Sequence, residues 1–171
     1  MNQTALDHAI QLHPDLWQIK DLLSRPELEE LVRRINIEPC WKKLDLQQDF
    51  NRESMIWNND GVLDWVWTML HSLDFSKFGL TFSNVMIWRD REGYGISRHE
   101  DNERVTAAMQ IYLSPTVANL GTWFLDEIEI PFVQNTGYLM HNRNRLLHGM
   151  KSTVPVGYTR LSFYALFDQL S

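Results

Sequence analysis

The sequence contains a single cysteine, Cys40, and no long run of apolar residues. One thiol cannot form an intrachain disulfide or supply the several thiolates of a structural zinc site, so the chain fits a reducing compartment. No apolar stretch approaches the length needed to cross a membrane, and Asp7 and His8 fall where a signal peptide needs apolar residues. These absences predict a cytoplasmic protein that has no membrane partner.

Basic residues are in the minority, with 16 Lys and Arg against 22 Asp and Glu and a formal net charge of −6 at pH 7. Proteins that coat nucleic acid draw their affinity from basic side chains that neutralise phosphates, so nucleic acid is not expected as a partner. With 171 residues, of which 44% are hydrophobic, the chain has the size and apolar content of one domain. No repeat or flexible linker divides it, and we predict a single domain over residues 1–171.

The first third of the chain carries helix signals. Ser24 and Glu27 match a capping box, in which the two side chains bond the first backbone amides of a helix. Apolar residues from Leu28 to Ile35 follow at helical spacing and predict a helix to about Ile35. A second apolar face predicts another helix at about 61–73.

From residue 80 onward the composition changes to short segments rich in β-branched and aromatic residues, separated by turn-forming Gly, Asn, Asp and Pro. One similar segment precedes the first helix. Helices followed by many short strands predict a mainly β (α+β) fold, an antiparallel sandwich or small barrel with helices packed on one side. The predicted strands cover residues 16–24, 80–88, 104–114, 121–125, 136–142 and 160–167.

His99 and Asp101 stand two residues apart in "SRHEDNE", just before an apolar run. On or at the edge of a strand, residues i and i+2 point the same way and can bind one ion together. An imidazole with a carboxylate suits Fe(II), Mn(II) or Zn(II). The pair alone is a weak signal, because six His and 22 acidic residues give about 0.8 such pairs by chance. A solvated turn is the alternative interpretation.

A second segment, "HNRNRLLHGMKSTVPVGYTRLSFYALF" (141–167), offers a third ligand in His148 and a cation in Arg160. Pro155 and Gly157 mark a turn between them, and a hairpin around Val154 would make His148 and Arg160 cross-strand neighbours. A metal held by three protein groups keeps positions open for a 2-oxo acid. The far carboxylate of that acid needs a fixed cation, and an arginine fork matches a carboxylate bidentately.

These residues resemble the Fe(II)- and 2-oxoglutarate-dependent dioxygenases, specifically the prolyl-hydroxylase-like branch. The family pattern is His-x-Asp, a distal His some tens of residues later and a basic residue ten to twelve positions beyond it. This chain offers His99, Asp101, His148 and Arg160 at those places. The segments "IYLSP", "GTWF", "LLHG" and "VPVGYTRLSFYALF" also resemble the corresponding segments of the family. The resemblance covers about residues 80–167.

The resemblance implies a double-stranded β-helix, a jelly roll with N-terminal helices packed on one sheet. It implies that the three ligands hold Fe(II) and that Arg160 binds the distal carboxylate of 2-oxoglutarate, helped by Ser162 or Tyr112. The enzyme would use O2 to couple decarboxylation of 2-oxoglutarate to hydroxylation of a second substrate, releasing succinate and CO2. A prolyl residue in a protein or peptide, or a small metabolite, is the expected second substrate.

The chain also departs from the family pattern. Relatives often carry a Tyr upstream of the first motif, and here either Trp88 or Tyr94 would take that place, so Tyr94 is a candidate co-substrate residue. Where the family typically has two glycines, this chain has only Gly121. His141, with Lys151 ten residues later, is the rival for the distal ligand and its cation.

Two other functions stay open. A non-catalytic jelly-roll binding module would use the same residues for a structural ion or for none. Base demethylation is the activity of AlkB-like relatives, which usually carry a further Arg six residues after the clamp, where this chain has Leu166. Arg98, Arg143 and Arg145 lie close to the ligands in sequence and are candidates for the mouth of the site, although exposed arginines usually serve solubility alone.

Overall fold

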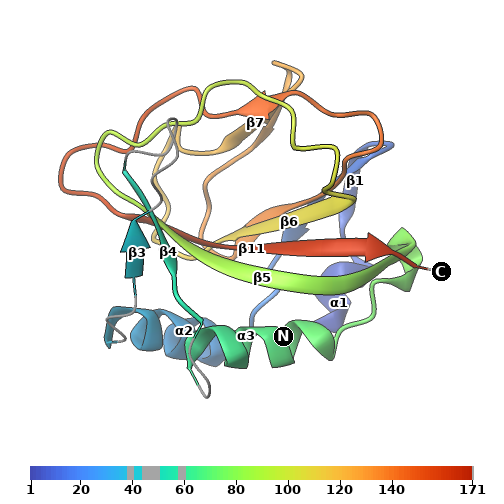
Figure 1. Ribbon diagram of the computed structural model, residues 1–171, viewed down its shortest axis with the longest axis horizontal. Helices are drawn as coiled ribbons and strands as arrows, with labels where there is room; N and C mark the ends of the chain where they lie inside the picture. Colours follow the sequence, from blue (N-terminus) through green and yellow to red (C-terminus); the bar gives the residue numbers. More distant parts are fainter. Residues whose placement is uncertain (38–40, 44–50, 58–60, 171) are drawn as a thin grey trace.

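The computed structural model describes residues 1–37, 41–43, 51–57 and 61–170, and Cys40 lies outside these ranges. The described α-helices all precede residue 72, and from residue 80 onward the described elements are strands, as the sequence predicts (Figure 1). No helix in the described ranges is long and apolar enough to cross a membrane. In chain order the elements are α1 (Gln3–Asp7), β1 (Ile10–His13), β2 (Leu16–Lys20), α2 (Arg25–Ile37), β3 (Trp41–Lys43), β4 (Arg52–Met55), α3 (Val62–His71), the 3-10 helix η1 (Ser76–Phe78), β5 (Leu80–Asp90), β6 (Ala107–Tyr112), β7 (Thr122–Phe124), β8 (Ile128–Ile130), β9 (Thr136–His141), β10 (His148–Gly149) and β11 (Arg160–Gln169).

The strands form two antiparallel sheets. The large sheet has the order β1-β2-β9-β6-β11-β5-β4-β3, and the small sheet has the order β10-β7-β8. Several sheet neighbours are far apart in the chain, because the chain crosses repeatedly between the sheets and β11 returns to lie between β5 and β6. The predicted fold class, a mainly β jelly roll with N-terminal helices on one sheet, is confirmed.

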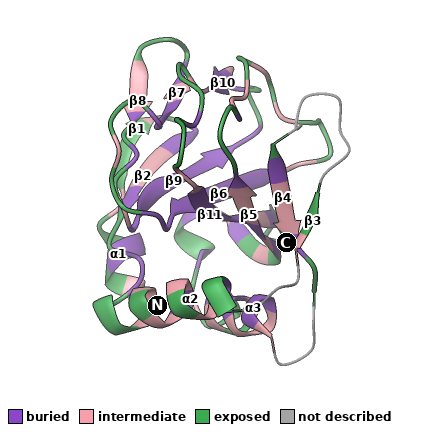
Figure 2. Cartoon of the chain, turned by 90° about the vertical axis from the view of Figure 1, so that its left-hand side faces the viewer, coloured by how far each residue is buried: buried purple, intermediate pink, exposed green. Residues whose placement is uncertain are grey.

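Helices α2 and α3 cover the outer face of the large sheet (Figure 1). Their apolar residues, such as Leu31 and Val66, join Ile87 of β5 and Phe163 of β11 in one core that is closed to solvent. Figure 2 shows the same division, with buried strands in the centre and exposed outer helix surfaces. Burial of these apolar faces is the main favourable term in holding the layers together.

A second core lies between the two sheets and contains Phe124 of the small sheet with Tyr138 and Met140 of the large one. Side chains on a strand alternate between the two faces. Along β11, Leu161 and Phe163 therefore belong to the helix-side core, and Arg160, Ser162 and Tyr164 project to the other face. That alternation brings polar side chains of β11 into the space between the sheets.

The predicted helices are confirmed. Helix α2 begins with the predicted capping residues, because Glu27 Oε2 accepts hydrogen bonds from the Ser24 amide and hydroxyl, each at 2.8 Å. Helix α3 lies within the predicted range 61–73. Every predicted strand overlaps an observed one, and β5 and β11 extend two residues beyond their predicted ends. The sequence did not indicate β1, β3, β4, β8 and β10, which have only two to four residues each.

The predicted hairpin between His148 and Arg160 is wrong. His148 pairs with Phe124 in the small sheet, whereas Arg160 pairs with Asp90 in the large sheet. Val154, the expected turn, instead exchanges backbone hydrogen bonds of 2.7 and 2.8 Å with Tyr94 and Gly93. The segment between His148 and Arg160 therefore crosses from one sheet to the other and does not turn back on itself.

Candidate metal and co-substrate site

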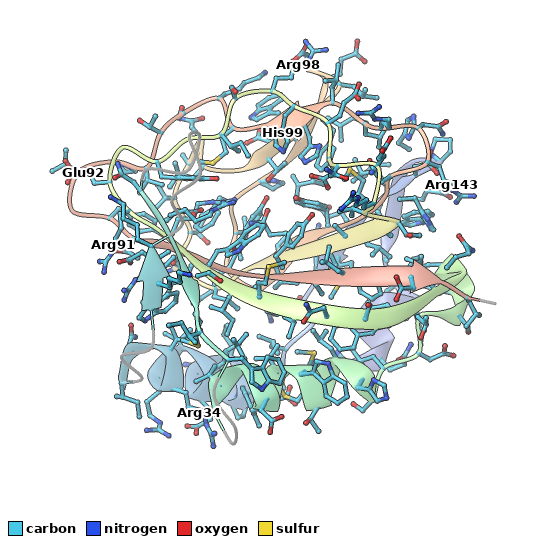
Figure 3. The ribbon with its side chains drawn as sticks, in the orientation of Figure 1. Arg34, Arg91, Glu92, Arg98, His99 and Arg143 are labelled. Atoms are coloured by element: carbon cyan, nitrogen blue, oxygen red, sulfur yellow. The ribbon has the colours of Figure 1, made fainter. Side chains whose placement is uncertain are left out.

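Three predicted ligand residues converge between the sheets. His99 and His148 face each other across an isolated β-bridge, with two backbone N to O distances of 2.9 Å. Asp101 follows two residues after His99, and its Oδ1 lies 3.8 Å from His99 Nε2 and 3.7 Å from His148 Nε2. One ligand atom from each residue lies within 4.8 Å of the other two. Figure 3 shows His99 inside the upper part of the molecule.

Backbone carbonyls orient both imidazoles. His99 Nδ1 lies 2.9 Å from the Ser97 carbonyl oxygen, and His148 Nδ1 lies 2.8 Å from that of Leu146. A carbonyl only accepts, so each Nδ1 carries the proton, and the Nε2 lone pair points toward Asp101. Burial lowers the pKa of His148 although the Asp101 charge opposes this. The neutral form that binds a metal is therefore favoured at neutral pH.

Asp101 is held by a tyrosine. The Tyr164 hydroxyl donates to Asp101 Oδ2 at 3.1 Å, so that Oδ1 remains directed at the two histidines. The pKa of Tyr164 lies well above its usual value, first because of burial and then because of the Asp101 charge. The phenol therefore keeps its proton and acts as a donor. Its ring stacks on Trp88 with 4.3 Å between centroids.

Arg160 begins β11 and is 1% exposed. Its Nη1 donates to Asp90 Oδ2 at 2.6 Å, and Arg52 holds the same carboxylate through Nε at 2.6 Å and Nη2 at 3.2 Å. Arg160 Nε is buried and has no hydrogen-bond partner within the described ranges. A buried, unpartnered donor beside a cavity is the position that a ligand carboxylate would satisfy.

A cavity of about 60 Å³ connects the ligand residues with Arg160. This is room for about two water molecules, at about 30 Å³ each. The cavity is therefore too small to admit a peptide to the interior. Its polar lining also includes Gln110, Thr122 and Tyr138. Sequence reasoning missed these three, although a Gln inside the apolar strand "AAMQIY" is a visible signal.

Ser162 and Tyr112, the proposed helpers of Arg160, do not line the cavity but contact residues that do. Ser162 Oγ accepts from Gln110 Nε2 at 2.9 Å, and the Tyr112 hydroxyl lies 2.7 Å from Thr122 Oγ1. Burial raises the pKa of Tyr112, and the Arg160 charge opposes the rise. Both side chains therefore support residues that face the cavity. Their predicted contact with the co-substrate stays a prediction.

Trp88 and Tyr94 both lie near Arg52. Trp88 lines the cavity, and the Arg52 guanidinium lies over its ring at 4.0 Å from the centroid. The Tyr94 ring lies 4.3 Å from the same guanidinium. Of the two candidates, Trp88 is thus the one that faces the cavity.

The rival ligand His141 lies on the helix side of the large sheet. Its Nε2 is 2.9 Å from the Phe78 carbonyl oxygen, and its ring packs edge-on against Trp17. Lys151 Nζ lies 3.2 Å over the centre of the Trp123 ring. Neither residue is part of the cavity lining or of the ligand cluster in the described residues. The geometry therefore favours His148.

Each of the three candidate mouth arginines is paired with a carboxylate. Arg98 binds Asp126, Arg145 binds Glu100 at 2.8 Å, and Arg143 lies 3.4 Å from Asp15. Arg98 and Arg143 point outward at the periphery of the molecule (Figure 3). These pairs lower the positive charge that an anionic partner would meet.

The fold and the side chains define a jelly-roll protein with a candidate metal centre beside a buried arginine. No family model matches the sequence, and no curated protein matches it significantly. Similarity appears among solved structures. A prolyl hydroxylase from Trichoplax adhaerens, in complex with a peptide fragment of the hypoxia inducible factor oxygen degradation domain, has a TM-score of 0.70 at 14% identity, covering 98% of this chain and 87% of that chain.

Two further structures extend the comparison. A 2OG-Fe(II) oxygenase family oxidoreductase from Burkholderia pseudomallei has a TM-score of 0.69 at 11% identity, covering 97% of this chain and 87% of that chain. HygX from Streptomyces hygroscopicus, with nickel, 2-oxoglutarate and hygromycin B bound, has a TM-score of 0.61 at 8% identity, covering 99% and 88%. The chain thus has the fold of the 2OG-Fe(II) oxygenases, and the resemblance in its motifs is confirmed at the level of the fold.

Proposed function

We propose that this protein is an Fe(II)- and 2-oxoglutarate-dependent dioxygenase that hydroxylates a second substrate. The observation that carries the proposal is the convergence of His99, Asp101 and His148 in a cavity that Arg160 also lines. Two imidazoles and one carboxylate are the facial ligand set of non-haem Fe(II) oxygenases. The buried, unpartnered Nε of Arg160 fits the distal carboxylate of a 2-oxo dicarboxylic acid.

When bound, the iron and 2-oxoglutarate would supply the oxidation, in which O2 places one oxygen atom in succinate and one in the hydroxylated product, and CO2 is released. The chain's own residues bind and orient. The two carbonyl-bound imidazoles and the tyrosine-bound Asp101 offer three ligand atoms to the metal. Arg160 fixes the far end of the co-substrate through charge and shape. The apolar core between the sheets keeps bulk water from the reacting groups.

The second substrate would bind at the rim, because the cavity is too small to admit it. A prolyl residue of a peptide and a small metabolite both stay open as substrates. The Trichoplax hydroxylase with its bound peptide supports the first, and HygX with bound hygromycin B supports the second.

Base demethylation receives less support. Leu166 lies on β11 at the position where AlkB-like relatives usually carry a second arginine, and Arg98, Arg143 and Arg145 are each paired with a carboxylate. The non-catalytic binding module remains the alternative that an experiment must exclude.

The test is an anaerobic titration of the metal-free protein with Fe(II) and then 2-oxoglutarate, following the visible charge-transfer band of the chelate. We expect the band in the wild type and its loss in His148→Ala, which retains two of the three ligands. His8→Ala, at an exposed histidine, is the matched control and should keep the band. Succinate formation after admission of air then measures turnover.

His141→Ala separates the two candidates for the distal ligand and should also keep the band. Loss of the band in His141→Ala, with retention in His148→Ala, would transfer the distal ligand to His141. A folded wild type that gives no band would overturn the dioxygenase and leave the binding module.

A further inference from the structure

Arg52, Asp90 and Arg160 form a buried cluster beside the cavity, and both arginines line it. They are register neighbours on three adjacent strands, since Asp90 of β5 pairs with Arg52 of β4 on one side and with Arg160 of β11 on the other. The exposed fractions are 6% for Arg52, 0% for Asp90 and 1% for Arg160. A buried carboxylate is tolerated when it is paired and hydrogen-bonded, and here two guanidinium groups share it.

Arg52 is held in one orientation. Its guanidinium lies between the rings of Trp88 and Tyr94, at 4.0 and 4.3 Å from their centroids. Its Nε and Nη2 grip the two oxygens of Asp90 in a bidentate pair. Arginine is suited to such a position because its planar group stacks on aromatic rings and binds a carboxylate with two parallel hydrogen bonds.

The charges of the cluster explain why two arginines are needed. The three described side chains carry two positive charges and one negative charge, so one positive charge remains. If Arg52 were absent, Asp90, which lies 2.6 Å from Arg160, would neutralise the one arginine left among the described residues that line the cavity. A ligand carboxylate would then meet a neutral pair and would add an unbalanced negative charge in a region shielded from water.

We propose that Arg52 compensates the charge of Asp90 and so leaves Arg160 available for the distal carboxylate of a 2-oxo dicarboxylic acid. Asp90 in turn positions Arg160, because it binds Nη1 and leaves the edge that carries Nε for the ligand. Arg52 and Asp90 are positioning residues that determine selectivity for a dicarboxylate. The inference rests on the proposed function, since it concerns the same co-substrate.

The test compares two oxo acids on the Fe(II)-loaded full chain without O2. 2-Oxoglutarate carries the distal carboxylate, and 2-oxobutanoate binds a metal through the same 2-oxo acid group without it. Arg52→Met should weaken 2-oxoglutarate binding at least tenfold and change 2-oxobutanoate binding less than threefold. The double variant Arg52→Met with Asp90→Asn removes both members of the ion pair, and should recover at least threefold of the lost 2-oxoglutarate affinity.

Arg89→Met is the matched control. Arg89 is also ion-paired, at 2.6 Å to Glu53, and stacked on a tryptophan, but it lies away from the cavity lining. It should leave the binding of both oxo acids within twofold. Equal weakening of both oxo acids in Arg52→Met would assign Arg52 a structural role only. A double variant that binds 2-oxoglutarate no better than Arg52→Met would refute charge compensation.

Arg52→Lys keeps the charge and decides the question if Arg52→Met does not fold. It should bind 2-oxoglutarate within threefold of the wild type, and a tenfold loss with unchanged 2-oxobutanoate binding would overturn the inference. Failure of the proposed function looks different, because the wild type would then bind neither oxo acid at the metal.

Discussion

Gly149 follows the candidate ligand His148 and lies directly against the segment that carries His99. A Cβ atom at this position would lie 2.9 Å from Arg98 N, 3.0 Å from Arg98 Cα and 3.0 Å from Ile96 O. All three are backbone atoms, so no side chain can rotate away to make room. We therefore predict that Gly149→Ala separates the two histidines.

The size of the effect follows from these contacts. They fall 0.4 to 0.5 Å short of the 3.4 Å at which ordinary contact begins, so the two backbones must part by about that amount. Metal-ligand distances tolerate changes of only about 0.2 Å. We expect Fe(II) binding to weaken by about 10- to 100-fold, the range found when ligand orientation is disturbed, which equals about 1.4 to 2.8 kcal/mol. Overpacking should also reduce the free energy of unfolding by about 1 to 3 kcal/mol.

The assay is calorimetric titration of the metal-free variant with Fe(II) under anaerobic conditions, combined with urea unfolding. Gly157→Asn is the control, because Gly157 has open space around it and Asn tolerates its left-handed backbone conformation. This control should keep Fe(II) affinity within twofold of the wild type. A folded Gly149→Ala protein that also binds Fe(II) within twofold of the wild type would refute the steric argument.

Two further predictions concern single hydrogen-bonding side chains. Tyr164→Phe removes the hydrogen-bond donor to Asp101 but keeps the ring stack on Trp88. Fe(II) affinity should therefore fall about tenfold while thermal stability changes little. Unchanged affinity in an Fe(II) titration would contradict the role of the phenol. Asn135 bonds both the amide and the carbonyl of Leu23, at 3.0 and 2.7 Å, so Asn135→Ala should lower the free energy of unfolding by about 3 kcal/mol. Urea unfolding measures this loss, and a loss below about 1 kcal/mol would show that water replaces the side chain.

The sequence predicts most of the fold because the relevant signals are local. Hydrophobic period and capping residues place α2 and α3, and each strand of six or more residues is visible as a β-branched and aromatic run. The five short strands are not visible, because two to four residues carry too little pattern. These short strands form because they pair with neighbouring strands, as β10 pairs with β7.

The candidate ligands His99, Asp101 and His148 are also predictable, but only when the resemblance to the dioxygenases is added to residue type and spacing, and His141 stays a rival until the structure places it outside the cavity. The spatial relation of His148 to Arg160 is not predictable, because it depends on which sheet each residue joins. Arg52 and Asp90 illustrate the same limit. They lie 38 residues apart, and neither carries a local signal before strand pairing brings them together.

The candidate site is built from residues of both sheets. The His148 strand belongs to the small sheet, and Arg160 belongs to the large one. The distance between the candidate metal ligand His148 and Arg160 therefore depends on the distance between the two sheets, which is about 10 Å in β-sandwiches. Phe124 sets that spacing beside the site, because its ring stacks on His148 at 5.3 Å and meets Tyr138 of the large sheet at 4.9 Å. The second core thus helps to set the separation between His148 and Arg160, the two groups that would bind the metal and the proposed co-substrate.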